Sequence, residues 1–143
     1  MLACFRVSVE SVIFHQGKVL LVKRAPTCKV APGVWNVPAG KVNILEITIG
    51  AVVRETFEET KLKVNVIKLL SESAFEIKVG DETAYRNMFT YLTTPESPDP
   101  VVELDNEHTE YAWVAEEDLR SKTYSSLMPR LKSLIEGALT GTQ

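Results

Sequence analysis

The stretch 40–62 places the strongest constraint on what this chain can fold into. If residues 47–60 form a helix, Glu55, Glu58 and Glu59 stand at i, i+3 and i+4 and share one stripe of its surface. Three apolar residues would lie on the opposite face: Ile49, Val53 and Phe57. The spacing therefore predicts a helix that buries its apolar face and holds carboxylates close enough to repel one another. A cation is expected among them.

A simpler interpretation is a solvated helix face, because glutamate favours helices and most charged helix faces bind nothing. Two neighbouring features favour a functional site instead. Glu46 lies at the predicted helix start, and Gly40 opens a loop long enough to fold back over it. Arg54 lies beside Glu55, and its fork of N–H donors can orient a carboxylate in a way that lysine cannot.

The order of these residues resembles the sequence motif of the Nudix hydrolases: Gly40, five residues, Glu46, seven residues, then Arg54-Glu55-Thr56-Phe57-Glu58-Glu59. Every charged position of that motif is present. The chain departs from the usual pattern at Ala39, Leu45, Thr56 and Lys61. Glycine is usual at 61, and a side chain in a left-handed helix-ending position costs about 1 kcal/mol. Lys61 therefore predicts a different helix exit with the chemistry retained, and Leu45 predicts a less regular loop.

The resemblance implies a metal site. Two or three Mg²⁺ or Mn²⁺ ions would be held by Glu58 and Glu59, with the carbonyl of Gly40 and Glu55 completing the shell. In the family, a glutamate on the loop before a late strand can bind metal or act as the general base, and Glu107 is the candidate here. Either Glu55 or Glu107 would take the proton from water.

The same resemblance implies supporting roles for other charged residues. Glu46 would support the loop or bind metal through water, and Arg54 would organise the carboxylates. A basic residue near the end of the second strand can reach substrate phosphate, which makes Arg24 the substrate-binding candidate. A solvated strand-end cation is the alternative for Arg24. His108 is interpreted as a structural or solvated loop residue.

Length and composition limit the remaining possibilities. A chain of 143 residues with 45% hydrophobic content predicts one domain, residues 1–143, with one core. The apolar runs are too short to span a membrane, so we expect a cytoplasmic protein with no membrane partner. Two cysteines are too few for a disulfide framework, and we expect Cys4 in the core and Cys28 in a loop.

The net charge of −3 argues against a nucleic-acid polymer as partner, because no basic stripe exists to neutralise a phosphate backbone. A small nucleotide remains compatible with this charge. It would need a divalent metal ion to overcome repulsion from the glutamates.

Alternating and β-branched residues predict two hairpins, and proline-rich stretches at 25–33 and 94–100 predict loops. The predicted elements are strands at 5–14, 18–24, 64–77, 83–93 and 111–115, a helical turn at 116–119 and a helix at 128–139 with Leu131, Leu134, Ile135 and Leu139 inward. The long strands of the second hairpin are expected in the centre of the sheet. This order predicts an α/β (α+β) fold, a mixed β-sheet between helices, in agreement with the Nudix α/β/α sandwich.

The predicted activity is metal-dependent cleavage of the pyrophosphate bond of a nucleoside diphosphate linked to another group. The favoured substrate is a nucleoside triphosphate or a modified one, giving the monophosphate and pyrophosphate. No proline of the kind associated with ADP-ribose hydrolysis occurs in residues 62–94. A nucleotide-sugar or ADP-ribose pyrophosphatase is the alternative within this class. A catalytically idle nucleotide-binding regulatory domain is the alternative from another class, and retention of the charged positions argues against it.

An apolar cluster at the loop and helix start occupies positions where the family is commonly polar: Ile44, Leu45, Ile47 and Ile49. Not all four can face the core at helical spacing. We expect some of them to pack on a second copy of the chain as a homodimer. A locally repacked core is the alternative.

Overall fold

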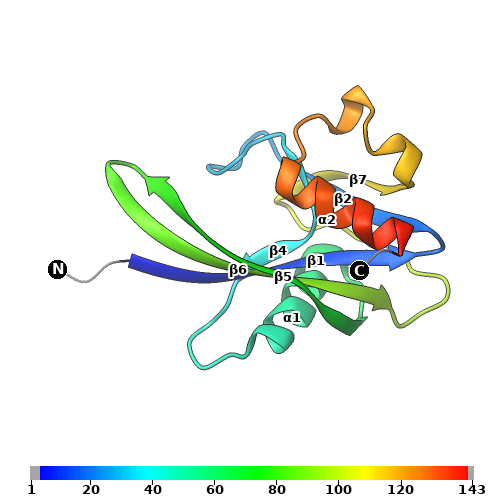
Figure 1. Cartoon of the computed structure of the whole chain (residues 1–143), viewed down its shortest axis with the longest axis horizontal. Helices are drawn as coiled ribbons and strands as arrows, with labels where there is room; N and C mark the ends of the chain where they lie inside the picture. The colour runs from blue at the N-terminus through cyan, green and yellow to red at the C-terminus, as the bar shows by residue number, and fades with distance from the viewer. Residues whose placement is uncertain (1–3, 142–143) are drawn as a thin grey trace.

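The computed structural model describes residues 4–141 as a mixed sheet of seven strands with a helix on each side (Figure 1). The elements are β1 (Cys4–His15), β2 (Lys18–Arg24), β3 (Trp35–Asn36), β4 (Ala39–Lys41), α1 (Thr48–Thr60), β5 (Val64–Val79), β6 (Glu82–Pro95), β7 (His108–Val114), η1 (Glu116–Asp118), η2 (Lys122–Tyr124) and α2 (Pro129–Thr140). The predicted mixed sheet between helices is confirmed. The core position expected for the Cys4 side chain lies outside what the structure describes.

The sheet has the strand order β3-β2-β1-β6-β5, with β4 pairing with β1 and β7 pairing with β2. β1 runs parallel to β6, and the other strand pairs are antiparallel. The hairpin prediction for β5 and β6 is confirmed, but a central position for both strands is wrong. β1 occupies one side of β6, so β5 takes the other side and ends this path of the sheet.

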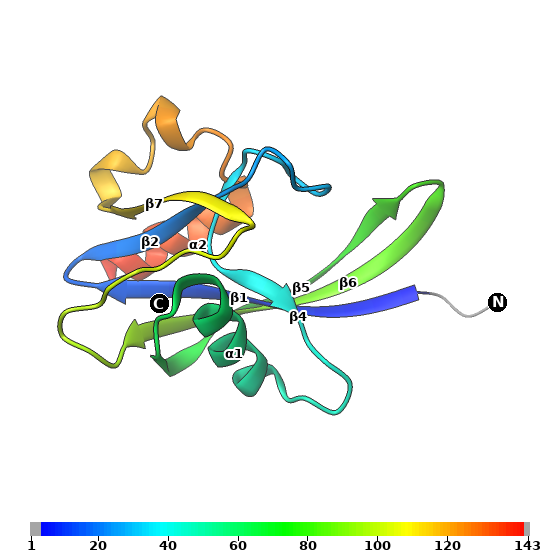
Figure 2. The ribbon, with the colours of Figure 1, turned by 180° about the vertical axis from the view of Figure 1, so that it is seen from behind.

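Two hairpin tips use residues with positive φ. Gln16 and Gly17 have φ of 50° and 76°, the combination that a two-residue hairpin turn requires. Gly80, at the tip between β5 and β6, has φ of 64°. This second hairpin and the start of β1 project beyond the part of the sheet that the helices cover (Figure 2).

Helix α1 matches the predicted range to within one residue, but of the three residues predicted to be buried only Val53 packs against the core. Ile49 and Phe57 are 50% and 39% exposed. The buried residues are instead Ala51, Val52, Thr56, Glu59 and Thr60. The hydroxyls of Thr56 and Thr60 donate to carbonyls four residues earlier, at 2.7 and 2.6 Å, so both side chains are buried with their polar atoms satisfied. Because α1 packs on this face and not on the predicted one, Glu59 of the acidic stripe is buried.

The helix ends at Lys61 in a left-handed conformation, with φ of 63° and its N–H donating to the Phe57 carbonyl at 2.9 Å. The predicted different exit is therefore wrong, because lysine adopts the conformation that glycine usually provides. The Lys61 ammonium also lies 5.3 Å from the centre of the Phe57 ring. Leu45 likewise has φ of 64°, so the loop keeps a conformation that favours glycine.

Apolar side chains fill both sides of the sheet. On the α2 side, Leu131 and Ile135 pack with side chains of β1, β2 and β7, as predicted, and Leu139 is partly buried against them. Leu134 is only partly buried and lies outside these clusters. On the α1 side, Ala51 and Val52 pack with Val9 and Tyr91. Within residues 4–141, no helix is long and apolar enough to cross a membrane.

Candidate active site

Arg54 is the centre of the charged cluster on α1. Its Nε and Nη2 atoms donate to the two carboxylate oxygens of Glu46, at 2.8 and 2.9 Å. Its Nη1 donates to Glu55 at 2.8 Å and to Glu58 at 3.2 Å, and Nη2 also donates to the carbonyl of Lys41 at 3.0 Å. These bonds raise the pKa of Arg54, chiefly through Glu46. One guanidinium therefore holds three carboxylates and the end of β4 together.

Glu46 fastens the loop between β4 and α1. Its carboxylate accepts the backbone N–H of Asn43 at 2.9 Å, and its own N–H donates to the Asn43 carbonyl at 3.0 Å. The Arg54 guanidinium, and then the Asn43 N–H, lower the pKa of Glu46 to about 2. The loop that Gly40 opens is thus closed onto the helix by an ionised side chain.

Glu59 has the opposite environment. It is 6% exposed, and its carboxylate accepts the N–H of Ala39 at 3.3 Å and lies 3.5 Å from His108 Nε2. Burial, and then the negative charges of Glu55 and Asp105, raise the pKa of Glu59 to about 9. Without a cation beside it, this carboxyl holds a proton at neutral pH.

Asp105 and His108 were not predicted as part of the site. His108 is 6% exposed at the start of β7, so the structural interpretation of this residue agrees with its position and the solvated one is wrong. Its Nδ1 lies 2.7 Å from Asp105 Oδ1, and the Asp105 N–H donates to the Glu59 carbonyl at 3.2 Å. The only local signal is an aspartate three residues before a histidine at the start of a strand. Asp105 therefore fixes the orientation of the His108 ring, whose other nitrogen faces Glu59.

Gly40 lies on β4 directly beneath Glu55. A Cβ at this position would collide with the Glu55 carboxylate, so the absence of a side chain allows Glu55 to lie against the strand. The Glu55 side chain is only 15% exposed. The strand and the helix therefore form a cradle in which the Glu55 carboxylate lies against the Gly40 backbone.

The donor atoms of this cradle suit a hard divalent cation, because Mg²⁺ and Mn²⁺ prefer carboxylate and carbonyl oxygens. As they stand, no three His, Cys, Asp or Glu side chains in residues 4–141 are grouped closely enough to hold a metal ion. Arg54 holds Glu58, whose side chain is 55% exposed, and Glu59 faces the interior. Only the Oε2 atom of Glu58 accepts from Arg54, so the other carboxylate oxygen can bind a cation while this 3.2 Å contact is kept.

Glu107 and Arg24 lie with a different loop. The Glu107 side chain is exposed, and its carbonyl accepts the N–H of Ala25 at 2.8 Å. Arg24 donates its Nε to the Val30 carbonyl at 2.8 Å. In the described part of the chain, neither side chain contacts the glutamates of α1. Their roles remain predictions.

Comparison with known proteins agrees with this arrangement. The NUDIX domain family matches residues 5–134, and the chain belongs to this family. No curated protein matches the sequence at a significant level. The chain is similar in structure to a MutT protein from Methanosarcina mazei Go1, with 24% identity, a TM-score of 0.77 and coverage of 99% of this chain and 97% of that one.

Two further solved structures share slightly more of the sequence. A NUDIX hydrolase from Nitrosomonas europaea is 27% identical, with a TM-score of 0.74 and coverage of 96% of this chain and 90% of that one. A MutT NUDIX hydrolase from Burkholderia pseudomallei is 28% identical, with a TM-score of 0.73 and coverage of 92% and 96%. The chain is thus a Nudix pyrophosphohydrolase, of the class that acts on phosphorus-containing anhydrides, and members of this family generally use divalent metal ions.

Proposed function

We propose that this chain is a metal-dependent hydrolase whose substrate is a nucleoside triphosphate, or a modified one, cleaved to the monophosphate and pyrophosphate. The observation that carries the proposal is the set of carboxylates gathered around Arg54 and against Gly40. A pyrophosphate bond is cleaved when charge on the phosphoryl oxygens is neutralised and water becomes a nucleophile. An oxygen-lined cradle on a rigid helix supports both requirements.

Each side chain has a proposed role. Glu58 and Glu59 would hold Mg²⁺ or Mn²⁺, with the Gly40 carbonyl and Glu55 completing the shell. The bound metal would supply positive charge to the phosphoryl oxygens and lower the pKa of a bound water. Arg54 keeps Glu55 and Glu58 in position, and Glu59 must lose its proton before it can bind a cation.

We assign the general base to Glu55 in preference to Glu107. Glu55 lies in the cradle with one carboxylate oxygen bound to Arg54. Glu107 would have to move from its exposed position beside Ala25 to reach the same water. Arg24 is proposed to bind substrate phosphate. Within residues 4–141 its guanidinium makes no hydrogen bond other than that from Nε to Val30, which is consistent with this role.

The test is a panel of nucleoside triphosphates, modified triphosphates and nucleoside diphosphate sugars, assayed with Mg²⁺ and with EDTA and analysed for products. Glu58→Gln and Glu59→Gln should each reduce turnover at least about a hundredfold with the fold intact. Glu72→Gln is the matched control, because Glu72 is an exposed glutamate on β5. Activity within about threefold of the parent in both site variants would contradict the ligand assignment. Faster hydrolysis of the diphosphate sugars would contradict the proposed substrate.

A further inference from the structure

Buried polar atoms without partners gather on one face of the sheet. Within residues 4–141, five buried side-chain nitrogen or oxygen atoms have no hydrogen-bond partner: Arg6 Nε, Ser73 Oγ, Arg86 Nε, Arg130 Nε and Arg130 Nη1. On β6, Arg86 pairs with Arg6 of β1, and Met88, two residues further, pairs with Ser73 of β5. Paired residues and residues two apart share a face, so three of these side chains project from the same side of the sheet. Buried polar groups without partners are rare in folded proteins, so this gathering of them on one face requires an explanation.

Arg130 belongs to the same face. Its Nη2 donates to both carboxylate oxygens of Glu10, at 3.0 and 2.9 Å. Glu10 lies four residues after Arg6 on β1 and therefore faces the same side. This glutamate is 3% exposed and also accepts the hydroxyl of Thr90 at 2.7 Å. Its negative charge is thus already balanced by Arg130.

Arg6 and Arg86 have no such balance. They are direct partners across neighbouring strands, which lie about 5 Å apart, and like charges directly opposite each other are destabilising. Neither arginine forms an ion pair or hydrogen bond with the described residues. Burial, and then the charge of Arg6, lower the pKa of Arg86, and the more distant Glu10 only partly offsets this. Two half-buried guanidinium groups therefore lie on neighbouring strands, and no described carboxylate forms an ion pair with either of them.

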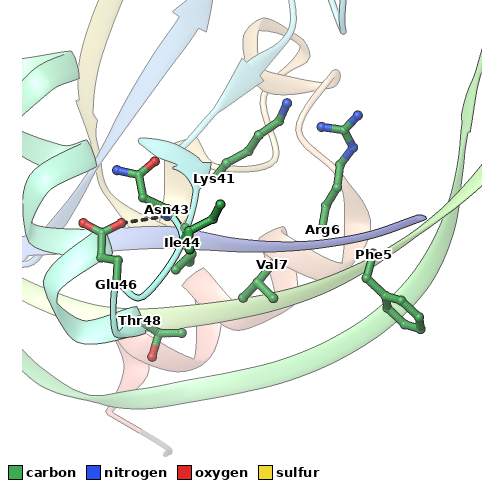
Figure 3. A pocket seen from close by; sticks show the side chains of 9 residues that line it. Phe5, Arg6, Val7, Lys41, Asn43, Ile44, Glu46 and Thr48 are labelled. Carbon is green, nitrogen blue, oxygen red and sulfur yellow. Dashed lines mark hydrogen bonds between the residues drawn. The ribbon is translucent and has the colours of Figure 1, made fainter. Parts of the chain in front are cut away.

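Lys41 adds a third cation. It pairs with Ser8 of β1, two residues after Arg6, so its side chain shares the face of Arg6. Figure 3 shows the side chains of Lys41 and Arg6 extending to one side of β1, while those of Phe5 and Val7 extend to the other. Arg6 and Lys41 both line an open groove of about 470 Å³ along the edge of β1. Arg6 and Lys41 are therefore accessible to a small anion from solvent.

The register places the cations beside the glutamate site. Gly40 pairs with Val9, and Arg6 lies three residues before Val9 on the same strand, about 10 Å away along the chain. The Glu55 carboxylate lies on the α1 side of β4, and the Lys41 side chain projects to the opposite side, while Glu46 lines the groove together with Arg6 and Lys41. Within residues 4–141, β4 pairs only with β1, so its other edge is open. An extended anion can cross this edge from one site to the other.

We propose that Arg6, Arg86 and Lys41 form an anion subsite that binds a phosphoryl group beyond the bond that is cleaved. The proposal rests on the proposed function for its biological ligand, and the shared chemistry is a phosphoryl dianion. Guanidinium and ammonium groups are the usual partners of such groups, and two arginines can bind one phosphate through several charged hydrogen bonds. The subsite favours substrates with a terminal phosphate over diphosphates linked to a neutral sugar.

The first test uses binding without catalysis. Calorimetric titration of the metal-free full-length protein with inorganic tripolyphosphate, and separately with orthophosphate, measures the subsite alone. Arg6→Gln and Arg86→Gln should each weaken tripolyphosphate binding at least about tenfold, because each removes charged hydrogen bonds. Arg120→Gln is the matched control, since this side chain is 79% exposed and its ion pair is with Glu136 of α2, at 3.5 Å, and with none of the residues of the groove. Tripolyphosphate should also raise the melting temperature of the parent and not that of the two variants.

The second test uses selectivity. With Mg²⁺, Arg6→Gln and Arg86→Gln should lower kcat/KM for a nucleoside triphosphate about tenfold more than for a nucleoside diphosphate linked to a neutral hexose. Parent-like tripolyphosphate binding in both variants, or equal losses for both substrates, overturns the subsite. Binding of orthophosphate alone, with no gain for tripolyphosphate, identifies a free-phosphate site and overturns the substrate role. If no nucleotide is hydrolysed but the variants lose tripolyphosphate binding, the proposed function fails and the subsite stands.

Both arginine variants are expected to fold, because each replacement removes an unpaired, partly buried charge. Their melting temperatures without ligand should equal or exceed that of the parent. A lower melting temperature in both would show that the arginines serve the fold, and it would count against an anion site.

Discussion

The substitution Glu59→Gln tests how much the burial of this carboxyl group lowers the stability of the folded protein, independently of its role in catalysis. Glu59 is 6% exposed and accepts the N–H of Ala39. Glutamine has the same shape, and its amide oxygen can keep this bond, so the substitution removes only the ability to ionise. In metal-free protein we expect Glu59→Gln to be more stable than the parent at alkaline pH, although it is inactive.

The sign follows from proton binding. The pKa of Glu59 is about 9 in the folded protein, against 4.5 for an ordinary glutamate, so the folded state holds the proton over this range and the unfolded state has released it. The contribution to stability is complete below pH 4.5 and is lost as the pH rises through 9. The slope is at most about 1.4 kcal/mol per pH unit. From pH 6 to pH 8, the parent should lose up to about 3 kcal/mol through this group.

Urea unfolding at pH 6 and pH 8 in EDTA measures this loss, provided that the unfolding transition is two-state. Glu58→Gln is the matched control, since it makes the same change one residue earlier on a side chain that is 55% exposed. Other groups that face Glu59, namely Glu55, Asp105 and His108, remain in every variant. The difference between the Glu59→Gln and Glu58→Gln slopes therefore isolates the buried carboxyl.

Two results would refute this reasoning. One is an equal loss of stability between pH 6 and pH 8 in the parent and in Glu59→Gln. The other is a flat pH dependence in Glu58→Gln, which would assign the effect to the exposed carboxylate. Mg²⁺ provides a further check, because a cation that binds an ionised carboxylate replaces its proton. Saturating Mg²⁺ should flatten the slope of the parent and leave that of Glu59→Gln unchanged.

Three further predictions concern other parts of the site. Gly40→Ala should reduce turnover at least about a hundredfold, because the new methyl group displaces the Glu55 carboxylate. Gly50→Ala is the control: its methyl group makes only ordinary van der Waals contact, so turnover should stay at the parental rate. Single-turnover rates should fall strongly in Glu55→Gln, and Glu107→Gln should mainly weaken Mg²⁺ binding; the reverse pattern would make Glu107 the base. The parent should sediment as a dimer at tens of micromolar, about the range suited to a standard interface. Leu45→Asp should sediment as a monomer, because Leu45 is 100% exposed and belongs to the apolar cluster. A monomeric parent refutes the homodimer.

The exposure of the apolar cluster answers a question that the sequence left open. Ile44, Leu45, Ile47 and Ile49 are 94%, 100%, 72% and 50% exposed. The alternative of a locally repacked core is therefore wrong. The helical spacing correctly indicated that these side chains could not all face inward. The sequence carries no information on the second surface that would cover them.

Local features of the fold were predictable, because they depend on neighbouring residues. Helix α1 follows from its period, and the hairpin at Gln16 and Gly17 follows from a turn between two β-branched runs. The contact of Arg54 with Glu58 also follows from the i,i+4 spacing, and its contact with Glu55 agrees with the expectation that Arg54 orients a neighbouring carboxylate. These interactions lie within one helix and its preceding loop.

Long-range features were not predictable. The burial of Glu59 depends on Ala39, which precedes it by twenty residues, and on His108, which follows it by forty-nine. No period or motif links these positions. The orientation of α1 depends on small side chains such as Ala51, which let the helix approach Tyr91, and these outweigh the larger apolar stripe at Ile49 and Phe57. The edge position of β5 depends on the parallel pairing of β1 with β6.

The motif usually has glycine at positions 40, 45 and 61, and the reason for glycine differs between them. Leu45 and Lys61 each adopt positive φ, at a cost of about 1 kcal/mol per residue. Arg54 makes charged hydrogen bonds to three carboxylates in the same segment, and this network holds the loop and the start of the helix in place while both residues keep the left-handed conformation. At Gly40 the demand is for space, because any side chain would occupy the position of the Glu55 carboxylate. Replacement of glycine is therefore tolerated at 45 and 61 and is excluded at 40.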